Sequence, residues 1–382
     1  MRGFERRELR RKATGTTSRL KPLLQHLGAA ALVLLTAARA WAAYVTPDQA
    51  GFHHCVLIYD SPKRSAEGYL PFVAHLDAGS APDQWLFDAF LLCAHEGGPS
   101  TRASYHEGPT NRADWEALRD GFFAPERGPA ALQAAIDRAE ERLGKRPQPV
   151  QVIVTIPFPS PQQADFGDVT GDGVSEDLSE MGGLEAAVTW YVQEVLDRWQ
   201  PTRFPDLRLW GFYWTHEGLR TGEIERVQRV ARIAHERGYR LLWIPWFRAP
   251  GFERWQECGF DVAILQPNYA FLSDHLGKVR SDRLLETARL AQGLGMGVEM
   301  EVGYNPEADL RVREIFRDYM AFGGSYRGGY QDAALAYFQS LDVFGTLCRS
   351  SDPDARRASG SLLRQSVPNT SRLWKYASAA SW

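Results

Sequence analysis

Cysteine is scarce in this chain of 382 residues, and its spacing argues against one class of metal site. The four cysteines are Cys55, Cys93, Cys258 and Cys348, and no two of them form a C-x-x-C pair. Zinc sites built from thiolates commonly use such pairs, so we expect no site of this class. Disulfides and buried free thiols are both compatible with the four positions.

The chain also has no large excess of positive or negative charge. The formal net charge is −3, from 44 Lys and Arg against 47 Asp and Glu. Proteins that bind nucleic acid usually carry a strongly basic surface, so we expect no nucleic-acid partner. The composition, with 44% hydrophobic and 24% charged residues, is that of a globular protein with a large core. It does not indicate an oligomeric state.

Long hydrophobic runs are missing apart from one near the N-terminus. Residues 1–21 are basic, "LGAAALVLLTAA" (27–38) is apolar, and "AWA" (40–42) has the small-x-small pattern of a cleavage site. The apolar run is shorter than the roughly 20 residues that span a bilayer. We therefore expect an export signal over residues 1–42. The mature protein is then periplasmic or extracellular, with no membrane association after cleavage; an uncleaved anchor is the alternative.

The chain does contain a series of short apolar runs, most of them followed by a helical pattern. Near-continuous apolar strands indicate burial on both faces, as in a parallel sheet. No G-x-G-x-x-G motif follows the first run, which argues against a dinucleotide-binding open sheet, the main rival fold. The eight runs are 55–60, 84–92, 150–159, 207–217, 240–247, 261–269, 295–302 and 333–340.

Helical periodicity separates most of these runs. Alternation of strands and helices over eight strands is typical of a (β/α)8 TIM barrel, which we predict as a single α/β domain over residues 43–347. Residues 348–382 are rich in Ser and Arg, and we expect them to form a poorly ordered tail. The helices are predicted within 128–144, 184–199, 223–238, 283–295 and 310–324.

Carboxylates stand at the ends of two of the predicted strands. Glu217 ends the fourth run, and Glu299 and Glu301 end the seventh. Active sites of such barrels lie at the C-terminal ends of the strands. Burying a lone carboxylate is costly, so residues of this kind need partners or a chemical role. Glycoside hydrolysis needs two carboxyl groups, one to protonate the leaving oxygen and one to attack the anomeric carbon or activate water.

We assign Glu217 as the general acid/base and Glu301 as the nucleophile. Glu299 and Glu301 are two apart in a strand, so they point to the same side. Glu301 lies nearer the mouth and Glu299 is expected to support it, although the spacing leaves open which of the two acts. When two carboxylates lie close together, their repulsion raises the pKa of one of them, and that acid then stays protonated. The alternative is that these residues form ion pairs that only hold the mouth together.

Other residues at the strand ends are candidates for binding a sugar. The apolar face of an aromatic ring matches the C–H face of a pyranose, although core packing is the alternative for each such residue. The expected substrate-binding residues are Asp60, Asp88, Trp214, Trp246, Gln266, Asn268 and Tyr269.

The stretch "DFGDVTGDGVSEDLSE" (165–180) has the spacing of a calcium-binding loop. Oxygen ligands at alternate positions wrap around a hard cation, and Gly173 allows the sharp turn. Ser179 stands at the twelfth position, where an EF-hand has Glu. We therefore expect a structural Ca²⁺, with a solvated acidic turn as the alternative, and no cofactor for catalysis. The expected ligands are Asp168, Thr170, Asp172 and Glu176.

The chain resembles the bacterial secreted family catalogued as domain of unknown function 4855. Six motifs between about His53 and Gln339 carry this resemblance: "HHCVLIYD", "WLFDAFLL", "FGDVTGDGVSEDLS", "LWGFYWTHEG", "GFDVAILQPNYAF" and "GMGVEMEV". The resemblance implies a setting among polysaccharide-processing proteins, without an assigned activity. The acids on strands four and seven also resemble the layout of retaining TIM-barrel glycosidases, in which the strand-four signature is Asn-Glu. Here that signature is His216-Glu217.

These features predict an exported glycoside hydrolase that cleaves a polysaccharide or oligosaccharide with retention. The first alternative is a non-catalytic glycan-binding or cell-envelope protein on the same scaffold, because fold alone does not give function. The second is a metal-dependent hydrolase such as a deacetylase, which needs a His/Asp cluster at the mouth. His53 and His54 begin their strand and so lie at the wrong end for that role. Neither the sugar nor its linkage is indicated.

Overall fold

A computed structural model describes residues 43–350 and 352, except for 78, 95, 200, 272–279 and 304–309. The side chains of 280–281 and 310–313 are also outside the description. The export signal predicted for residues 1–42 and nearly all of the tail predicted for 348–382 lie outside the described residues.

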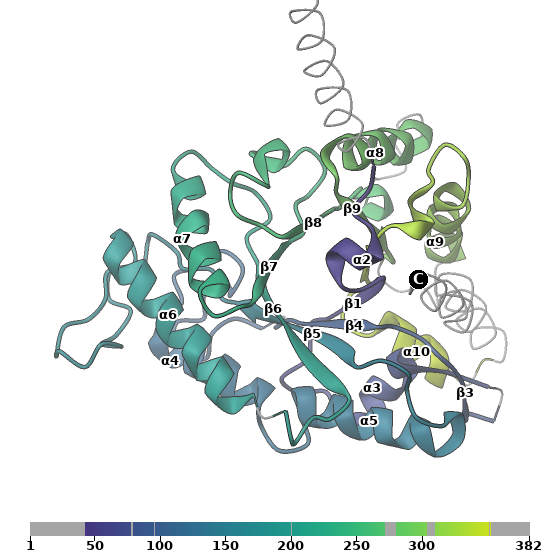
Figure 1. The fold of residues 1–382 in the computed structure, drawn as a ribbon, viewed down its shortest axis with the longest axis horizontal. Coiled ribbons are helices and arrows are strands. Elements are labelled where there is room, and N and C mark those ends of the chain that lie inside the picture. The colour runs from purple at the N-terminus through teal and green to yellow at the C-terminus, as the bar shows by residue number, and fades with distance from the viewer. Residues whose placement is uncertain are drawn as a thin grey trace, which may run out of the picture.

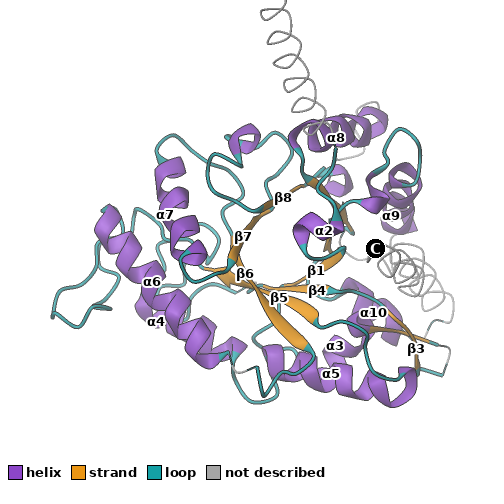
Figure 2. Ribbon diagram, in the orientation of Figure 1, coloured by secondary structure: helices purple, strands orange, loops and turns teal. Residues whose placement is uncertain are grey.

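Eight parallel strands close into a barrel, as the sequence predicts (Figure 1). Around the ring the order is β1-β10-β9-β8-β7-β6-β5-β4, so almost every strand pairs with its neighbour in the chain. This is the (β/α)8 arrangement, because helices lie outside the ring of strands (Figure 2). The strands are β1 (His54–Ile58), β4 (Ala89–Leu92), β5 (Val150–Ile156), β6 (Leu207–Trp214), β7 (Arg240–Trp243), β8 (Val262–Leu265), β9 (Gly297–Glu301) and β10 (Leu335–Phe338).

Helices connect most of the successive strands. Between β7 and β8 there is only the 3-10 turn η1 (Phe252–Arg254), which agrees with the short link in the sequence. No helix among the described residues is long and apolar enough to cross a membrane. The helices are α2 (Pro47–Ala50), α3 (Ala66–Val73), α4 (Arg112–Phe122), α5 (Gly128–Leu143), α6 (Met181–Arg198), α7 (Glu223–His235), α8 (Arg280–Leu294), α9 (Leu310–Gly323) and α10 (Val343–Arg349), with 3-10 turns η2 (Tyr269–Phe271) and η4 (Tyr330–Asp332).

The second predicted strand differs from the observed one. A hairpin of β2 (Ala74–Leu76) and β3 (Pro82–Trp85) precedes β4, so the apolar run 84–92 is divided between two sheets. Residues 86–88 join these sheets, and only the last four residues of the run belong to the barrel. At the other end of the chain, α10 continues to Arg349, two residues beyond the predicted domain boundary.

One bulge in β6 decides which of its side chains enter the barrel. Val152 and Ile153 of β5 pair with Leu209 and Gly211, so Trp210 is the extra residue. Gly211 has a φ of 151°, and a Cβ atom there would lie 2.2 Å from the Arg240 carbonyl oxygen. Because the bulge shifts the alternation by one residue, Trp210 and Tyr213 both pack in the barrel interior.

The N-terminal end of the barrel is closed by the short helix α2, which lies within the ring of strands in Figure 1. Trp210 Nε1 and Arg240 Nη1 both donate hydrogen bonds to the Ala50 carbonyl, at 2.7 and 3.0 Å. Ala50 is fully buried against the interior cluster. The opposite end, where the strands finish, therefore carries the candidate site.

Candidate active site at the barrel mouth

Three glutamates from two strands gather at the C-terminal end of the barrel. Glu299 and Glu301 belong to β9, and Glu217 follows β6 by three residues. Glu217 is half-buried, whereas Glu299 and Glu301 are 2% and 0% exposed. The carboxyl group of Glu299 lies close enough to both other acids for their charges to raise its pKa. The sequence thus predicted correctly that these acids meet.

Glu301 is held by three hydrogen-bond donors. The backbone N–H groups of Asn268 and Ala270 donate to its two carboxylate oxygens at 2.7 and 3.2 Å. The Tyr319 hydroxyl, from α9, donates to the same oxygen as Ala270. Burial raises the pKa of Glu301 to about 7, and the three donors oppose that rise because they stabilise the ionised form. Glu301 is therefore the acid of the cluster that is built to carry a negative charge.

Glu299 differs from Glu301 in its hydrogen-bond partners. Its Oε1 has no hydrogen-bond partner among the described residues. Burial, followed by the charges of Glu301 and Glu217, raises the pKa of Glu299 well above its usual value. A buried carboxyl group with an unpartnered oxygen is more stable in its neutral form, so the surroundings of Glu299 favour the protonated acid.

Glu217 is the acid that is half-exposed at the mouth. Burial raises its pKa, a hydrogen bond from Gln266 opposes this rise, and the charge of Glu107 adds to it. Gln266 is fixed in turn, since its Nε2 donates to the Ile244 carbonyl at 2.9 Å and its Oε1 accepts from Asn268 Nδ2 at 3.1 Å. An acid with a raised pKa at an accessible position is suited to proton donation.

Of the predicted substrate-binding residues, Gln266, Asn268 and Trp246 lie around these acids. Trp246 is 36% exposed, and its ring lies against the backbone next to Glu217: a Cβ atom on Gly218 would be 2.8 Å from it. Tyr269 is buried, and its hydroxyl donates to Asp318 Oδ2 at 2.8 Å. Its ring packs edge-on against Tyr319, so it supports the donor to Glu301.

The prediction for Trp214 is wrong. Because of the bulge in β6, Trp214 points out of the barrel and is 1% exposed within the core. Its ring packs edge-on against Phe158 at 5.7 Å between ring centroids. It lies among the side chains that fill the space between strands and helices, where a sugar has no access.

The prediction for Asp88 is also wrong. Asp88 precedes β4 and so lies at the closed, N-terminal end of the barrel. Its two carboxylate oxygens accept the backbone N–H groups of His53 and His54 at 2.9 and 2.7 Å. The apolar run 84–92 suggested one continuous strand and therefore placed Asp88 near the wrong end.

Replacing Asp88 by Ala is expected to lower the free energy of unfolding by about 2–3 kcal/mol, because it leaves two buried N–H groups without acceptors. Asp88→Asn, which keeps one acceptor oxygen, should lose less. The measurement is the urea midpoint of each variant. An Ala variant as stable as the parent protein would contradict the anchoring role.

Asp60 follows β1 and is committed to an ion pair. Its carboxylate lies 2.7 Å from the guanidinium of Arg64, whose side chain is 2% exposed. Arg64 also pairs with Asp342 at 2.7 Å and donates to the carbonyls of Gly68 and Leu341. This cluster ties the β1–α3 turn to the segment after β10, so Asp60 helps to hold the rim together.

His216 faces away from the mouth, as its alternation with Glu217 predicts. Its ring lies 4.6 Å from that of Phe158 and its Nδ1 lies 3.5 Å from Glu223. It is therefore a packing residue.

The sequence analysis missed the loop that follows β4. His106 joins this loop to β6, because its Nε2 lies 3.1 Å from the Ala94 carbonyl and its Nδ1 bonds the Thr215 hydroxyl. Glu107, the next residue, is exposed and close enough to act on the pKa of Glu217. A signal was present in the chain: the triplet His-Glu-Gly occurs at 95–97, 106–108 and 216–218.

The predicted calcium loop uses its acids to bind its own backbone. Asp168 accepts the N–H groups of Gly171 and Gly173 at 2.6 and 2.9 Å, and Asp172 accepts that of Val174 at 2.8 Å. The hydrogen bonds to Asp168 lower its pKa. Asp168, Asp172 and Glu176 do not form a set of converging ligands in the described part of the chain. With Thr170 also hydrogen-bonded to Asp168 at 3.4 Å, the calcium site stays a prediction.

One set of three acids does converge, but it lies away from the mouth, and two of the three acids already pair with a lysine. Among the described residues, only Asp137, Glu140 and Asp206 are close enough together to share an ion. Lys145 lies 2.6 Å from Asp206 and 3.1 Å from Glu140. Asp137 and Asp206 also accept hydrogen bonds from Gln133 Nε2, each at 2.8 Å, so the three acids already have partners within the protein.

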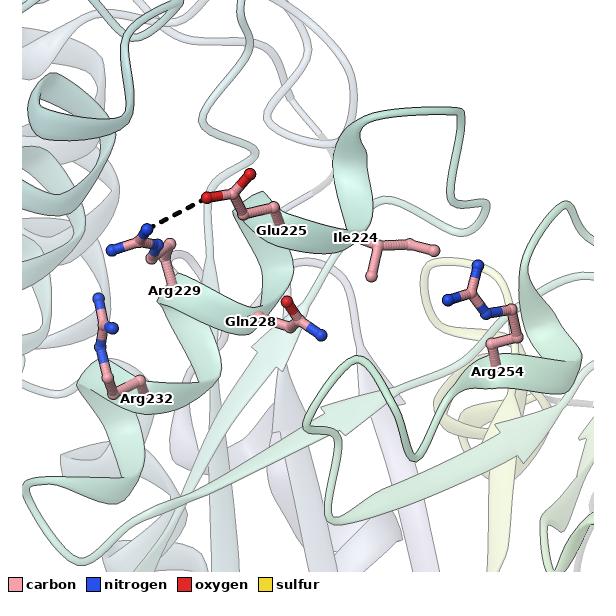
Figure 3. A pocket seen from close by; sticks show the side chains of 6 residues that line it. All are labelled: Ile224, Glu225, Gln228, Arg229, Arg232 and Arg254. Atoms are coloured by element: carbon pink, nitrogen blue, oxygen red, sulfur yellow. Dashed lines mark hydrogen bonds and ion pairs between the residues drawn. The ribbon is translucent and has the colours of Figure 1, made fainter.

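A hollow on the outer face of α7, shown in Figure 3, is a second candidate site that lies away from the mouth. Its arginines are paired: Arg229 with Glu225 at 3.1 Å and Arg254 with Glu257 at 2.8 Å. It brings no unpaired acid or base together, so the chemistry is assigned to the mouth. The lining residues are Ile224, Glu225, Gln228, Arg229, Arg232 and Arg254.

Comparison with known proteins identifies a family. The model of the family described as "Domain of unknown function (DUF4855)" matches residues 54–364. No protein with a curated description matches the sequence. A mutant tryptophan synthase alpha-subunit from the hyperthermophile Pyrococcus furiosus is 12% identical, with 82% of this chain and 97% of that chain covered and a TM-score of 0.35. The alpha-subunit of the same organism analysed by X-ray methods and calorimetry is also 12% identical, with the same coverage and a TM-score of 0.34.

Proposed function

Since the chain belongs to the family described as domain of unknown function (DUF4855), whose description names no activity, we propose a function from the chemistry of the mouth. The protein is an exported glycoside hydrolase that cleaves a glycosidic bond of a polysaccharide or oligosaccharide with retention. Glu217 is the general acid/base and Glu301 is the nucleophile. The observation that supports this most strongly is the contrast between the acids: one half-exposed carboxyl group with a raised pKa, and one carboxylate held by three donors.

The two roles follow from these environments. In the first step, Glu301 attacks the anomeric carbon while Glu217 gives its proton to the leaving oxygen, and a glycosyl ester on Glu301 forms. In the second step, Glu217 takes a proton from water, the water attacks the anomeric carbon, and the ester bond to Glu301 breaks. The raised pKa of Glu299 favours its neutral form, which limits the negative charge next to Glu301.

Replacing Tyr319 by Phe is expected to raise the pKa of Glu301 above its value of about 7, because the ionised form loses a donor. A hydrogen bond to a charged group is worth about 1.5 kcal/mol, which corresponds to about one pKa unit. Catalysis needs ionised Glu301, so the acidic limb of kcat/KM should move to higher pH by about that amount. The measurement is the pH profile of kcat/KM.

Tyr269→Phe is the matched control, because Tyr269 packs against Tyr319 but donates to Asp318. It should leave the acidic limb in place. If the Tyr319→Phe variant folds normally and its acidic limb does not move, Glu301 is not the group whose ionisation governs the reaction.

A non-catalytic glycan-binding protein is the second candidate. The observation in its favour is that Glu301 is 0% exposed and already satisfied by protein donors, as in a carboxylate with a purely structural role. This candidate predicts binding without turnover, and it predicts that Glu217→Gln leaves the affinity for glycans unchanged.

The experiment that separates the two candidates is a reducing-end assay of the purified protein on plant and bacterial polysaccharides. The Glu217→Gln variant at the same concentration is the control. New reducing ends from the parent protein alone support the hydrolase. Their absence on every polymer, with binding to at least one, supports the binding protein.

A further inference from the structure

Two exposed aromatic rings lie at the mouth, and each of them adjoins one of the two proposed catalytic acids. In the described part of the chain, three large aromatic side chains are exposed: Trp246 at 36%, Phe271 at 42% and Tyr326 at 92%. Tyr326 lies in the connection from α9 to β10, at the closed end of the barrel. The other two follow β7 and β8 at the open end.

The placement of Trp246 ties it to the general acid. Its ring lies against Gly218, the residue after Glu217, so closely that a Cβ atom there would be 2.8 Å from it. The ring of Trp246 leaves no space for a side chain on Gly218. This close contact holds the ring beside Glu217.

Phe271 is linked to Glu301 through the backbone of the residue before it. It ends the turn η2, whose residue Ala270 donates its N–H to Glu301 at 3.2 Å. The ring of Phe271 packs edge-on against Phe338 of β10 at 5.6 Å, and Phe338 packs edge-on against Tyr59 at 5.6 Å. Phe338 and Tyr59 are themselves half-buried. Phe271, which is 42% exposed, thus belongs to a group of packed rings at the rim.

Aromatic side chains together with a few polar groups are typical of ligand-binding sites. A flat ring beside amide and carboxyl groups suits a molecule with an apolar face and a polar edge, which is the character of a pyranose. The exposed acid at this rim, Glu107, disfavours a polyanionic ligand.

We propose that Trp246 and Phe271 are sugar-stacking platforms on the two sides of the bond that is cut, so that the ligand is an uncharged polysaccharide bound across the mouth and cleaved within the chain. This inference rests on the proposed function for the position of the cut, but the binding of an extended chain does not depend on turnover.

The test measures binding in the Glu217→Gln background, where the polymer is not consumed. Affinity electrophoresis is run in gels that contain hydroxyethylcellulose, lichenan, arabinoxylan, galactomannan or laminarin, with alginate as the acidic polymer. Added substitutions are Trp246→Ala, Phe271→Ala and, as the matched control, Tyr326→Ala. For the polymer that retards the protein, each platform variant should bind about tenfold more weakly or worse, as for other aromatic anchors. Tyr326→Ala should bind as the parent does.

Chain length provides the second measurement. Affinity for oligosaccharides of the bound polymer should keep rising beyond the disaccharide, since both platforms must be covered. Platform variants that bind like Tyr326→Ala, an affinity that stops rising at the disaccharide, or retardation by none of the uncharged polymers would overturn the proposal. Platform-dependent binding without any hydrolysis by the parent protein would refute the proposed hydrolase and leave this inference standing. If both platform variants hydrolyse the polymer as fast as the parent protein does, this inference is refuted and the proposed hydrolase is left standing.

Discussion

Glu217→Gln is expected to lower kcat by about 10²–10⁴-fold, the range of a general acid–base contribution. Gln has nearly the same shape as Glu and cannot donate an acidic proton. Burial raises the pKa of Glu217, so its ionised form is not needed for stability, and the free energy of unfolding should change little. The measurements are steady-state kinetics on the polymer found by the reducing-end assay and a urea unfolding curve.

The role of Glu217 as an acid can be separated from a role in binding. A glycoside with a nitrophenolate leaving group needs little protonation, so the first step with such a substrate should be nearly as fast in the variant as in the parent. Glu107→Gln is the matched control, because Glu107 lies near Glu217 but is exposed. It should keep most of the activity. Equal losses on activated and natural substrates would rule out the acid role.

Arg64→Ala is expected to lower the free energy of unfolding by about 3–5 kcal/mol, as for other buried ion pairs that lose one partner. Arg64 is the centre of a cluster in which it bridges Asp60 and Asp342 and donates to the carbonyls of Gly68 and Leu341. Its removal leaves Asp60 without its cation and Asp342 with Arg349 alone, and it breaks the link between the turn after β1 and the segment after β10. The measurement is the urea midpoint together with the slope of the transition.

Two further variants test whether the loss of stability comes from the buried Arg64 cluster. Arg64→Lys keeps the charge but not the planar fork that reaches several acceptors, so it should recover only part of the loss. Arg138→Ala removes an ion pair with Glu67 whose two side chains are 47% and 74% exposed, and it should have little measurable effect. An Arg64→Ala protein as stable as Arg138→Ala would show that the cluster does not hold the rim.

The barrel itself could be predicted because its signal is spread over the whole chain. Eight apolar runs separated by helical periodicity leave few other ways to bury both faces of each strand. The acids on β6 and β9 could be placed at one mouth for the same reason, since all parallel strands finish on the same side of the barrel.

The errors have local causes. The bulge at Trp210 shifts the alternation in β6, and nothing in the apolar run 207–217 marks its position except Gly211. Trp214 therefore points outward instead of into the mouth. Asp88 was misplaced because a hairpin strand and a barrel strand follow one another within a single apolar run.

The contribution of His106 and Glu107 could not be inferred from periodicity. They lie in an irregular loop, and their positions depend on contacts with Ala94 and Thr215 that are distant in sequence. Similarly, the donors to Glu301 are two backbone N–H groups and a tyrosine on the following helix. Backbone donors have no signature in a sequence, so the difference between the three acids became apparent only from their surroundings.

The helix α2 has a consequence for how ligands bind and leave. Because it caps one end through Ala50, Trp210 and Arg240, and because side chains fill the barrel interior, the mouth is the end of the barrel that a ligand can reach. In the proposed hydrolase, substrate and product would therefore both use the mouth, and a released fragment would compete with the next chain for the same site. Slow release of the fragment would then appear as product inhibition, and the inhibition constant would report how tightly the mouth binds the fragment.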